Sequence, residues 1–213
     1  MARPARVSPD RILAAAALEF AERGFAGARV DRIARRARVN KAMLYYHFRS
    51  KQELYRALLR RTFTMAAERM QAIAEGGGSP AEKVDRVIAG MAALIHERAF
   101  LPAIMLREVA EGGAHLDRET LEALVGVPRA VGAIVLDGVA QGAFRPIHPM
   151  FAYLSMLAPI IMYLGGAPIR KEVTERHLMD LRALTADEFV QQLQAALRRA
   201  LAPDAAAPAR PTP

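Results

Sequence analysis

The stretch RVNKAMLYYHFRSKQEL, residues 38–54, decides the fold of this chain. It opens with a tight turn, Arg38-Val39-Asn40, and continues into a short helix expected from Lys41 to Tyr46. The residues just before it, Val30–Ala37, place apolar side chains at helical spacing and predict another short helix. Two short helices joined by a three-residue turn are what a helix-turn-helix unit requires.

Longer helices are expected on both sides of this unit. One begins at Ser8, a good N-cap that is followed by Pro9, and it ends at Gly24. The other begins after Ser50, whose hydroxyl faces Glu53 in a capping box, and it continues to residue 74. No segment alternates as a strand would, so the sequence predicts an all-α protein whose N-terminal domain is a three-helix unit that contains the helix-turn-helix.

The short helix that follows the turn has a packing face and a binding face. Leu44 and Phe48, four residues apart, are expected to anchor it to the preceding helices. In a helix-turn-helix the second helix enters the major groove of DNA. There a lysine reaches a guanine edge or a phosphate, and tyrosine and histidine donate to phosphates. The side chains left for this role are Lys41, Ala42, Tyr45, Tyr46 and His47, with Lys51 in support. The tyrosines could instead be packing aromatics, and His47 a structural histidine.

The charge distribution also indicates that the N-terminal part of the chain binds a polyanion. Residues 1–61 hold 15 Lys and Arg against 5 Asp and Glu, a net charge of +10, whereas residues 62–213 hold 15 and 17, a net charge of −2. A basic third on a near-neutral body suggests a polyanion-binding module. A run of arginines can also be no more than a solvated face, so charge alone does not identify the partner.

Composition excludes several classes of protein. The chain has 213 residues, enough for one or two domains, and with 53% hydrophobic residues it is not intrinsically disordered. With no cysteine it has no disulfides, thiolate-bound zinc or iron–sulfur cluster, and a cytoplasmic location is expected. No phosphate loop or nucleophile elbow appears, so we expect neither an enzyme nor a cofactor. Glu111 and His115 are four residues apart, but Gly112-Gly113 break the helix between them, and no metal site is predicted.

The remaining chain predicts further helices. The segment from Pro80 to Ile95 is amphipathic, Leu101 to Glu111 is shorter, and Asp117 to Gln141 should kink or break at Pro128. Residues 165–185 are expected to form an irregular connection before a last helix, residues 186–201. The predicted domains are 1–60, with a flexible basic arm at 1–7, and 61–202, followed by a disordered tail at 203–213.

One uncharged segment raises the question of a membrane. Residues 149–169 carry no charge, but only Pro149–Leu164 is expected to be helical. Sixteen residues at about 1.5 Å each span roughly 24 Å, which is shorter than a hydrocarbon core of ~30 Å. We therefore expect a helix that is buried or lies at a subunit interface, and no membrane partner.

Residues 8–59 resemble the DNA-binding domain of TetR/AcrR-type regulators. The resemblance is carried by residues 12–16 and 20–25, then Val30-Asp-Arg-Ile33-Ala34 and Ala37, then Leu44-Tyr-Tyr-His-Phe48 and Ser50-Lys-Gln-Glu-Leu54. It implies an all-helical homodimer that binds a palindromic operator. It also implies a C-terminal helical domain that dimerises and holds a small-molecule effector, whose binding releases the DNA.

The sequence departs from the family pattern at three positions. Arg38 stands where the family usually has glycine in the turn, Asn40 replaces a Ser or Thr cap, and Arg29 replaces a threonine that caps the preceding helix. Arg38 must therefore avoid or tolerate a positive φ. The full set of predicted DNA-contacting residues is Arg29, Arg38, Asn40, Lys41, Ala42, Tyr45, Tyr46, His47 and Lys51.

The C-terminal domain is rich in Met and aromatic residues. These residues could be ordinary core, or they could line an adaptable apolar pocket of the kind the resemblance implies, with His96, Glu97, Arg107 and Glu108 as possible polar anchors. The candidates for the ligand pocket are Met91, Phe100, Met105, Phe144, Phe151, Met156 and Tyr163, which favour an apolar or amphipathic effector. Dimerisation is expected through Pro149–Leu164 and Ala186–Leu201. The alternative is a DNA-binding adaptor that recruits a protein partner without an effector, which a fully packed C-terminal core would favour.

Overall fold

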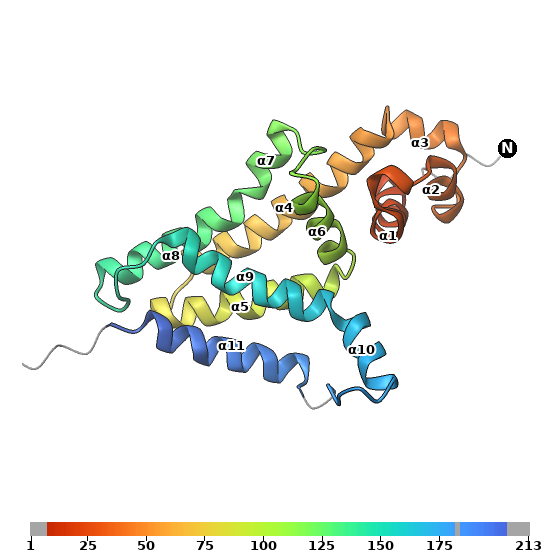
Figure 1. The fold of residues 1–213 in the computed structure, drawn as a ribbon. Coiled ribbons are helices and arrows are strands. Elements are labelled where there is room, and N and C mark those ends of the chain that lie inside the picture. Colours follow the sequence, from red (N-terminus) through yellow and green to blue (C-terminus); the bar gives the residue numbers. More distant parts are fainter. Residues whose placement is uncertain (1–7, 182–183, 204–213) are drawn as a thin grey trace, which may run out of the picture. The chain divides into compact units, whose positions relative to one another are not determined.

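The computed structural model describes residues 8–181 and 184–203. Within these ranges the chain is all-helical and contains no strand, as the sequence predicts (Figure 1). The predicted basic arm at 1–7 and positions 204–213 of the predicted tail lie outside the described residues. The helices are α1 (Pro9–Gly27), α2 (Val30–Arg36), α3 (Lys41–His47), α4 (Lys51–Glu75), α5 (Pro80–Glu97), α6 (Leu101–Ala110), α7 (Arg118–Leu124), α8 (Gly126–Ala140), α9 (Pro149–Gly165), α10 (Ala167–Glu175) and α11 (Ala186–Leu201).

These helices form two compact units. Of the described residues, the first contains 8–66 together with 97–126, and the second contains 67–96 together with 127–181 and 184–203. The first unit therefore holds the predicted three-helix domain together with α6 and α7. The division is not the simple one at residue 60 that the sequence predicts. It falls after residue 66, within α4, and the first unit also includes 97–126 because α6 packs on α1.

The core of the first unit follows the predicted pattern. The buried stripe of α1 includes Ile12, Leu13 and Phe20, and Ile33 of α2 and Leu44 of α3 are fully buried. Helix α1 packs on both α2 and α6. Ser8 caps α1 by accepting from the backbone N–H of Asp10, and regular helical geometry ends at Gly24, whose φ is +68°. The N-terminal helix boundaries could be predicted because they depend on such local signals.

The second unit contains one helix that the sequence analysis missed. The expected irregular connection over residues 165–185 includes α10, Ala167–Glu175. Helix α10 buries no residue, so it lacks the apolar stripe on which the expectation depended. Two ion pairs at i,i+4 spacing, Lys171–Glu175 and Glu172–Arg176, lie on its surface.

The predicted interruption near Pro128 is confirmed, and it falls at Val125, between α7 and α8. A proline ring clashes with the carbonyl four residues earlier, so a helix breaks on the N-terminal side of the proline. By length and composition alone, residues 118–140 taken together are apolar enough to cross a membrane, and the pair α9–α10 passes the same test when the two helices are counted as one span. The absence of a membrane partner therefore stays a prediction.

Candidate nucleic-acid interface

Helix α3 is held by a cap and two buried anchors. The Asn40 side chain accepts from the backbone N–H of Met43 at 2.7 Å, so asparagine acts as the N-cap that the sequence predicts. Leu44 is fully buried and Phe48 nearly so. A helix of only seven residues needs such support, because short helices are marginal in isolation. The anchors therefore fix which face of α3 points outward.

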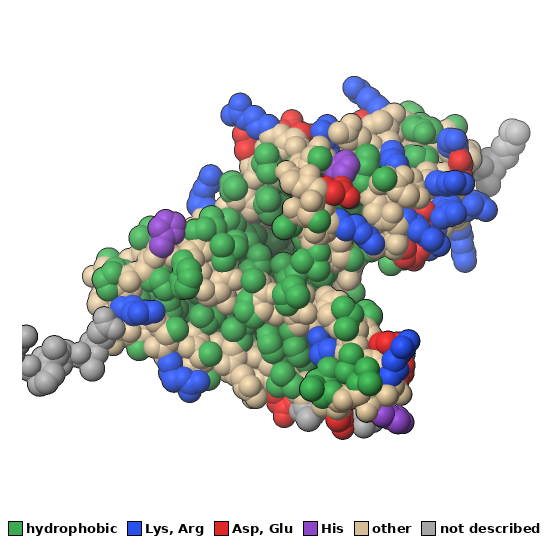
Figure 2. Space-filling model, viewed as in Figure 1, with side chains coloured by type: hydrophobic (Ala, Val, Ile, Leu, Met, Phe, Trp, Pro, Cys, Tyr) green, Lys and Arg blue, Asp and Glu red, His purple; other side chains and the backbone are tan. Residues whose placement is uncertain are grey.

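The outward face carries the residues expected to contact DNA. Tyr46 is 82% exposed, and Lys41, Ala42 and Tyr45 are exposed as well. His47 is half-buried, with its ring 5.3 Å from that of Tyr46 in an edge-on arrangement. Figure 2 shows Lys and Arg side chains gathered over the part of the molecule that holds α1–α3. The arrangement presents phenol and imidazole groups within a basic surface.

Lys41 has a partner in the free protein. Its Nζ lies 3.0 Å from Oδ1 of Asp31 on α2, and this hydrogen bond raises the pKa of the Lys41 ammonium group. Both side chains are more than half exposed, so the pair is screened by solvent. A base or phosphate contact by Lys41 would require exchange of this ion pair.

Arg38 adopts the backbone conformation that the family pattern gives to glycine. Its φ is +53°, in the left-handed region. The backbone N–H of Arg38 donates to the carbonyl of Arg35, and that of Val39 donates to Ala34, so the turn closes α2 through hydrogen bonds. The Arg11 guanidinium donates to the carbonyl of Ala37 at 2.7 Å and reinforces the same end. The arginine thus tolerates the positive φ.

The start of α2 is capped from another helix. Arg29 occupies the N-cap position without a side-chain cap, and its backbone N–H instead donates to Oε1 of Glu19 at 3.3 Å. Glu19 is only 2% exposed and also lies 3.7 Å from the Arg32 guanidinium. A carboxylate at a helix N-terminus is favoured by the helix dipole. Glu19 is not among the residues predicted from the sequence, although an acidic residue beside the buried stripe of α1 was a usable signal.

Lys51 is turned inward. Its Nζ donates to the carbonyl of Phe25 at 2.8 Å, with the carbonyls of Ala26 and Ala28 at 3.4 and 3.3 Å, and it lies 4.5 Å from the centre of the Phe25 ring. These carbonyls lie at and just beyond the end of α1, where a cation is stabilising. The geometry gives Lys51 a structural role. A DNA contact by Lys51 stays a prediction that would require it to leave these partners.

Several arginines near α3 have no acidic partner among the described residues. Arg36 pairs with Glu22 and Arg32 with Glu19, whereas the exposed guanidinium groups without such a pair belong to Arg29, Arg35, Arg38 and Arg49. Unpaired surface cations are available for phosphates, since a phosphate contact then breaks no internal pair. Arg49, at the end of α3, was not among the predicted contacts.

The predicted effector-pocket residues are spread over different environments. Met91, Phe144 and Met156 are buried core residues, and the Phe144 ring fills the space beside Gly138. Phe151 is exposed, whereas the Tyr163 ring stacks on Phe189 at 4.1 Å between centroids. The other two, Phe100 and Met105, belong to the first unit.

One groove in the second unit has the size of a small-molecule site. It has a volume of about 320 Å³, and the lining side chains come from α5, α9 and α11. The polar groups in it are His96, one of the predicted anchors, and Asp187; the apolar wall includes Ile160 and Phe189. None of the seven predicted pocket residues lines this groove.

An apolar face is exposed on α8 and α9. Large hydrophobic side chains that reach solvent there are Leu136, Met150, Phe151, Leu154 and Met162, and Figure 2 shows a continuous hydrophobic surface over this region. Helix α11 was expected to share the dimer interface, yet it exposes no large hydrophobic side chain within its described length. Exposed apolar surfaces of this kind occur at protein–protein contacts.

Comparisons with known proteins agree with this architecture. Residues 12–58 match the family model for bacterial regulatory proteins of the tetR family. The HTH-type transcriptional repressor KstR2 of Mycolicibacterium smegmatis is 31% identical over 140 residues, which cover 64% of this chain and 67% of that protein. The repressor SCO4008 of Streptomyces coelicolor is 47% identical over 58 residues, covering 27% of this chain and 30% of SCO4008.

The fold is also that of a solved structure. The transcriptional regulator FadR from Bacillus subtilis, in complex with stearoyl-CoA, superimposes with a TM-score of 0.67 at 21% identity, covering 88% of this chain and 98% of FadR.

Proposed function

We propose that this chain, which belongs to the TetR family, is a repressor released from a palindromic operator by a small apolar or amphipathic effector. Membership of the family makes it a DNA-binding transcriptional regulator and not an enzyme. The observation that carries the proposal is the exposed face of α3, which a cap and two buried anchors hold outward within a basic surface. We place its site of action in the cytoplasm.

The proposed DNA contacts follow from exposure and pairing. Lys41 and Ala42, at the start of α3, face the base edges, while Tyr45, Tyr46 and His47 donate to phosphates. Arg29 and Arg38 flank α2 and bring further positive charge to the backbone, and Asn40 acts through its cap. Phosphate contacts fix position, whereas contacts to base edges give sequence preference.

A palindromic operator requires two copies of α3 related by a twofold axis. We propose that a homodimer forms through the apolar face of α8 and α9, with Phe151 and Leu154 at its centre. Large exposed apolar patches mark interaction surfaces in soluble proteins. The sequence predicts a dimer interface formed by α9 and α11, whereas the interface proposed here is formed by α9 and α8.

The proposed effector site is the groove lined by α5, α9 and α11. Its wall is apolar, and His96 and Asp187 supply polar groups that could orient a ligand. FadR, which shares the fold, was solved with stearoyl-CoA, a ligand that carries a long apolar chain. The effector must favour the DNA-free conformation, and a change from 1:99 to 99:1 needs about 5.5 kcal/mol of differential binding.

Electrophoretic mobility shift on the DNA upstream of the protein's own gene tests the DNA-binding part of this proposal. Tyr46→Phe should weaken binding to all sites about equally, because a phosphate contact carries no sequence information. Lys41→Ala should change preference at one or two base pairs, by roughly tenfold to a hundredfold. Lys171→Ala, which removes an exposed positive charge from α10, is the control and should bind as the unmodified protein does.

Two outcomes would contradict the proposal. If the protein shows no salt-dependent affinity for any duplex, the role of the basic surface is wrong. If Tyr46→Phe changes sequence preference, the phosphate assignment is wrong.

The adaptor alternative has one observation in its favour. Met91, Met156 and Phe144 are packed core residues and not the lining of a cavity. A thermal-shift screen with apolar ligands separates the two functions. An effector-responsive repressor should gain stability with at least one ligand and lose DNA affinity with the same compound, whereas an adaptor should do neither.

A further inference from the structure

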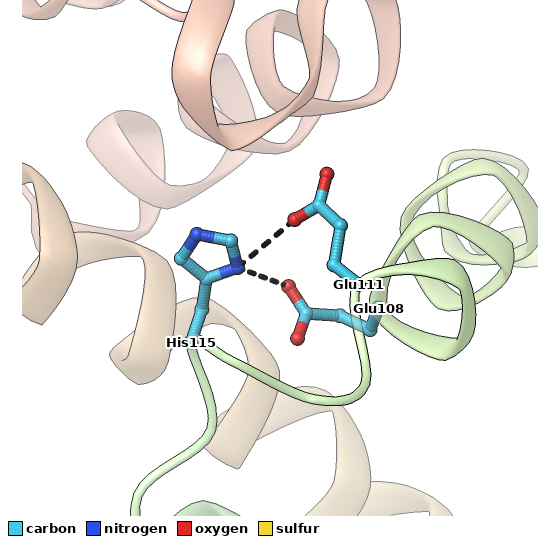
Figure 3. A group of neighbouring side chains, drawn as sticks. All are labelled: Glu108, Glu111 and His115. Atoms are coloured by element: carbon cyan, nitrogen blue, oxygen red, sulfur yellow. Dashed lines mark hydrogen bonds and ion pairs between the residues drawn. The ribbon is translucent and has the colours of Figure 1, made fainter.

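Two carboxylates and an imidazole converge at the end of α6. Glu108 and Glu111 lie on or just after its last turn, and His115 lies in the loop that leads to α7. His115 Nδ1 lies 2.9 Å from Oε1 of Glu108 and 3.3 Å from Oε2 of Glu111. Figure 3 shows the imidazole facing both carboxylates. The three potential ligand atoms lie within 4.8 Å of one another.

The loop brings His115 back over the helix. Gly112 and Gly113 both have positive φ, +68° and +74°, and the N–H of Gly113 donates to the carbonyl of Glu108 at 2.7 Å. Such a left-handed pair ends the helix at a Gly-Gly step. The glycines that led the sequence analysis to exclude a site here are therefore the residues that reverse the chain and place the imidazole against both carboxylates.

Protein groups alone do not satisfy this cluster. Nδ1 carries at most one hydrogen and so can donate to one carboxylate at a time, while ionised carboxylates only accept. Tyr55 adds one donor, its hydroxyl being 2.7 Å from Oε1 of Glu108. The Glu108 side chain is only 2% exposed, and its Oε2 atom has no hydrogen-bond partner among the described residues.

Nearby cations are directed elsewhere. The Arg107 guanidinium donates to the carbonyls of Phe20 and Ala21, and Arg56 donates to the backbone carbonyl of His115. The ring of His115 lies 4.1 Å from that of Phe25, so one wall of the site is aromatic. Among the described residues, His115 is the one ion-pair partner of these two carboxylates, and a neutral imidazole does not balance their charge. A buried carboxylate beside a second one is costly unless a positive charge joins them.

We propose that Glu108, Glu111 and His115 form a binding site for a divalent transition-metal cation. Mixed imidazole and carboxylate ligands suit Zn²⁺ and its neighbours, whereas Mg²⁺ and Ca²⁺ prefer oxygen ligands alone. Three protein ligands leave a further position for water. A bound cation would also satisfy Oε2 of Glu108 by bidentate coordination. The site is separate from the proposed DNA contacts and effector groove, so it does not depend on either.

Metal titration of the tag-free, chelator-treated full chain tests the site. Isothermal titration with Zn²⁺ should show one saturable site per chain, and Zn²⁺ at about 100 times the dissociation constant should raise the Tm by roughly 5 °C or more. Mg²⁺ at the same concentration should leave the Tm unchanged.

Variants locate the bound metal. Glu111→Gln removes one ligand from a half-exposed position, and His115→Phe keeps a ring against Phe25 while removing the nitrogen. Both should weaken Zn²⁺ binding at least about tenfold, since even indirect partners of metal ligands change affinity by that much. Glu122→Gln, on the exposed surface of α7, is the matched control and should bind as the unmodified chain does.

The proposal is overturned if the chain shows no saturable Zn²⁺ binding, because a proton shared between the carboxylates would then explain the cluster. It is equally overturned if Glu111→Gln and His115→Phe, with unchanged circular dichroism, bind Zn²⁺ as tightly as Glu122→Gln.

Discussion

Replacement of Arg38 separates backbone strain from charge at one position. Arg38 sits at φ +53° in the turn between α2 and α3, and its exposed guanidinium has no ion-pair partner among the described residues. Arg38→Gly removes both the strain and the charge, whereas Arg38→Ala removes only the charge. Comparison of the two variants therefore isolates the strain, and comparison of Arg38→Ala with the unmodified protein isolates the charge.

The stability difference follows from the backbone angle. A left-handed conformation costs a residue other than glycine about 1–2 kcal/mol. Glycine also increases the conformational entropy of the unfolded chain, which offsets roughly 0.4–1 kcal/mol of the stability gained by relieving this strain. Arg38→Gly should therefore be more stable than Arg38→Ala by about 1 kcal/mol, equivalent to roughly 2–4 °C in Tm for a chain of this size.

The DNA effect should be the same in both variants. A phosphate contact contributes about 0.9 to the slope of log affinity against log salt concentration, so a dimer that loses two such contacts should show a slope shallower by about 1.8. Fluorescence anisotropy with a labelled operator over a salt series measures this slope, and thermal or urea unfolding measures stability.

The stability result and the DNA result can each contradict these expectations independently. Equal stability of Arg38→Gly and Arg38→Ala would mean that residue 38 does not hold a left-handed turn in solution. An unchanged salt slope in both variants would mean that Arg38 contacts no phosphate, whatever its backbone conformation.

Three other changes test other parts of the structure. Phe151→Glu should convert a dimer to a folded monomer in sedimentation velocity, while Gln191→Glu on α11 should not; the reverse result would restore α11 as the interface. Lys51→Met should lower the free energy of unfolding by about 1–2 kcal/mol, as urea denaturation would show, because the carbonyls at the end of α1 lose a charged donor. It should leave the salt slope of DNA binding unchanged, and a shallower slope would show that Lys51 contacts phosphate after all. Burial raises the pKa of Tyr153 to about 12, so the neutral phenol is favoured in the folded state, and its contribution to stability is complete below pH ~10 and lost as the pH rises through 12. Urea unfolding at pH 9 and pH 11 should therefore show a smaller loss for Tyr153→Phe than for the unmodified chain, and an equal loss would contradict the assigned burial.

Local patterns predicted the parts of the interface that depend on neighbouring residues. The cap by Asn40 and the anchors Leu44 and Phe48 involve contacts within four residues or a repeated apolar spacing, and the structure contains all of them. The same reasoning could not find α10, whose stabilising pairs lie on an exposed surface and leave no apolar stripe. It also chose aromatic and methionine residues for a pocket without information on which of them pack against one another.

The amino-acid order by itself determined that this chain is helical, where the turn before α3 lies, and which face of α3 is exposed. Those features follow from caps and from the 3.6-residue period, which act over one or two turns. Only the tertiary structure decided that Lys51 donates to a carbonyl near the end of α1 and that Glu19 caps α2. The same holds for the hydrogen bonds of Glu108 with His115 and Tyr55. Tyr55 and Glu108 are 53 positions apart, and no local rule relates such residues, because their meeting depends on how whole helices pack.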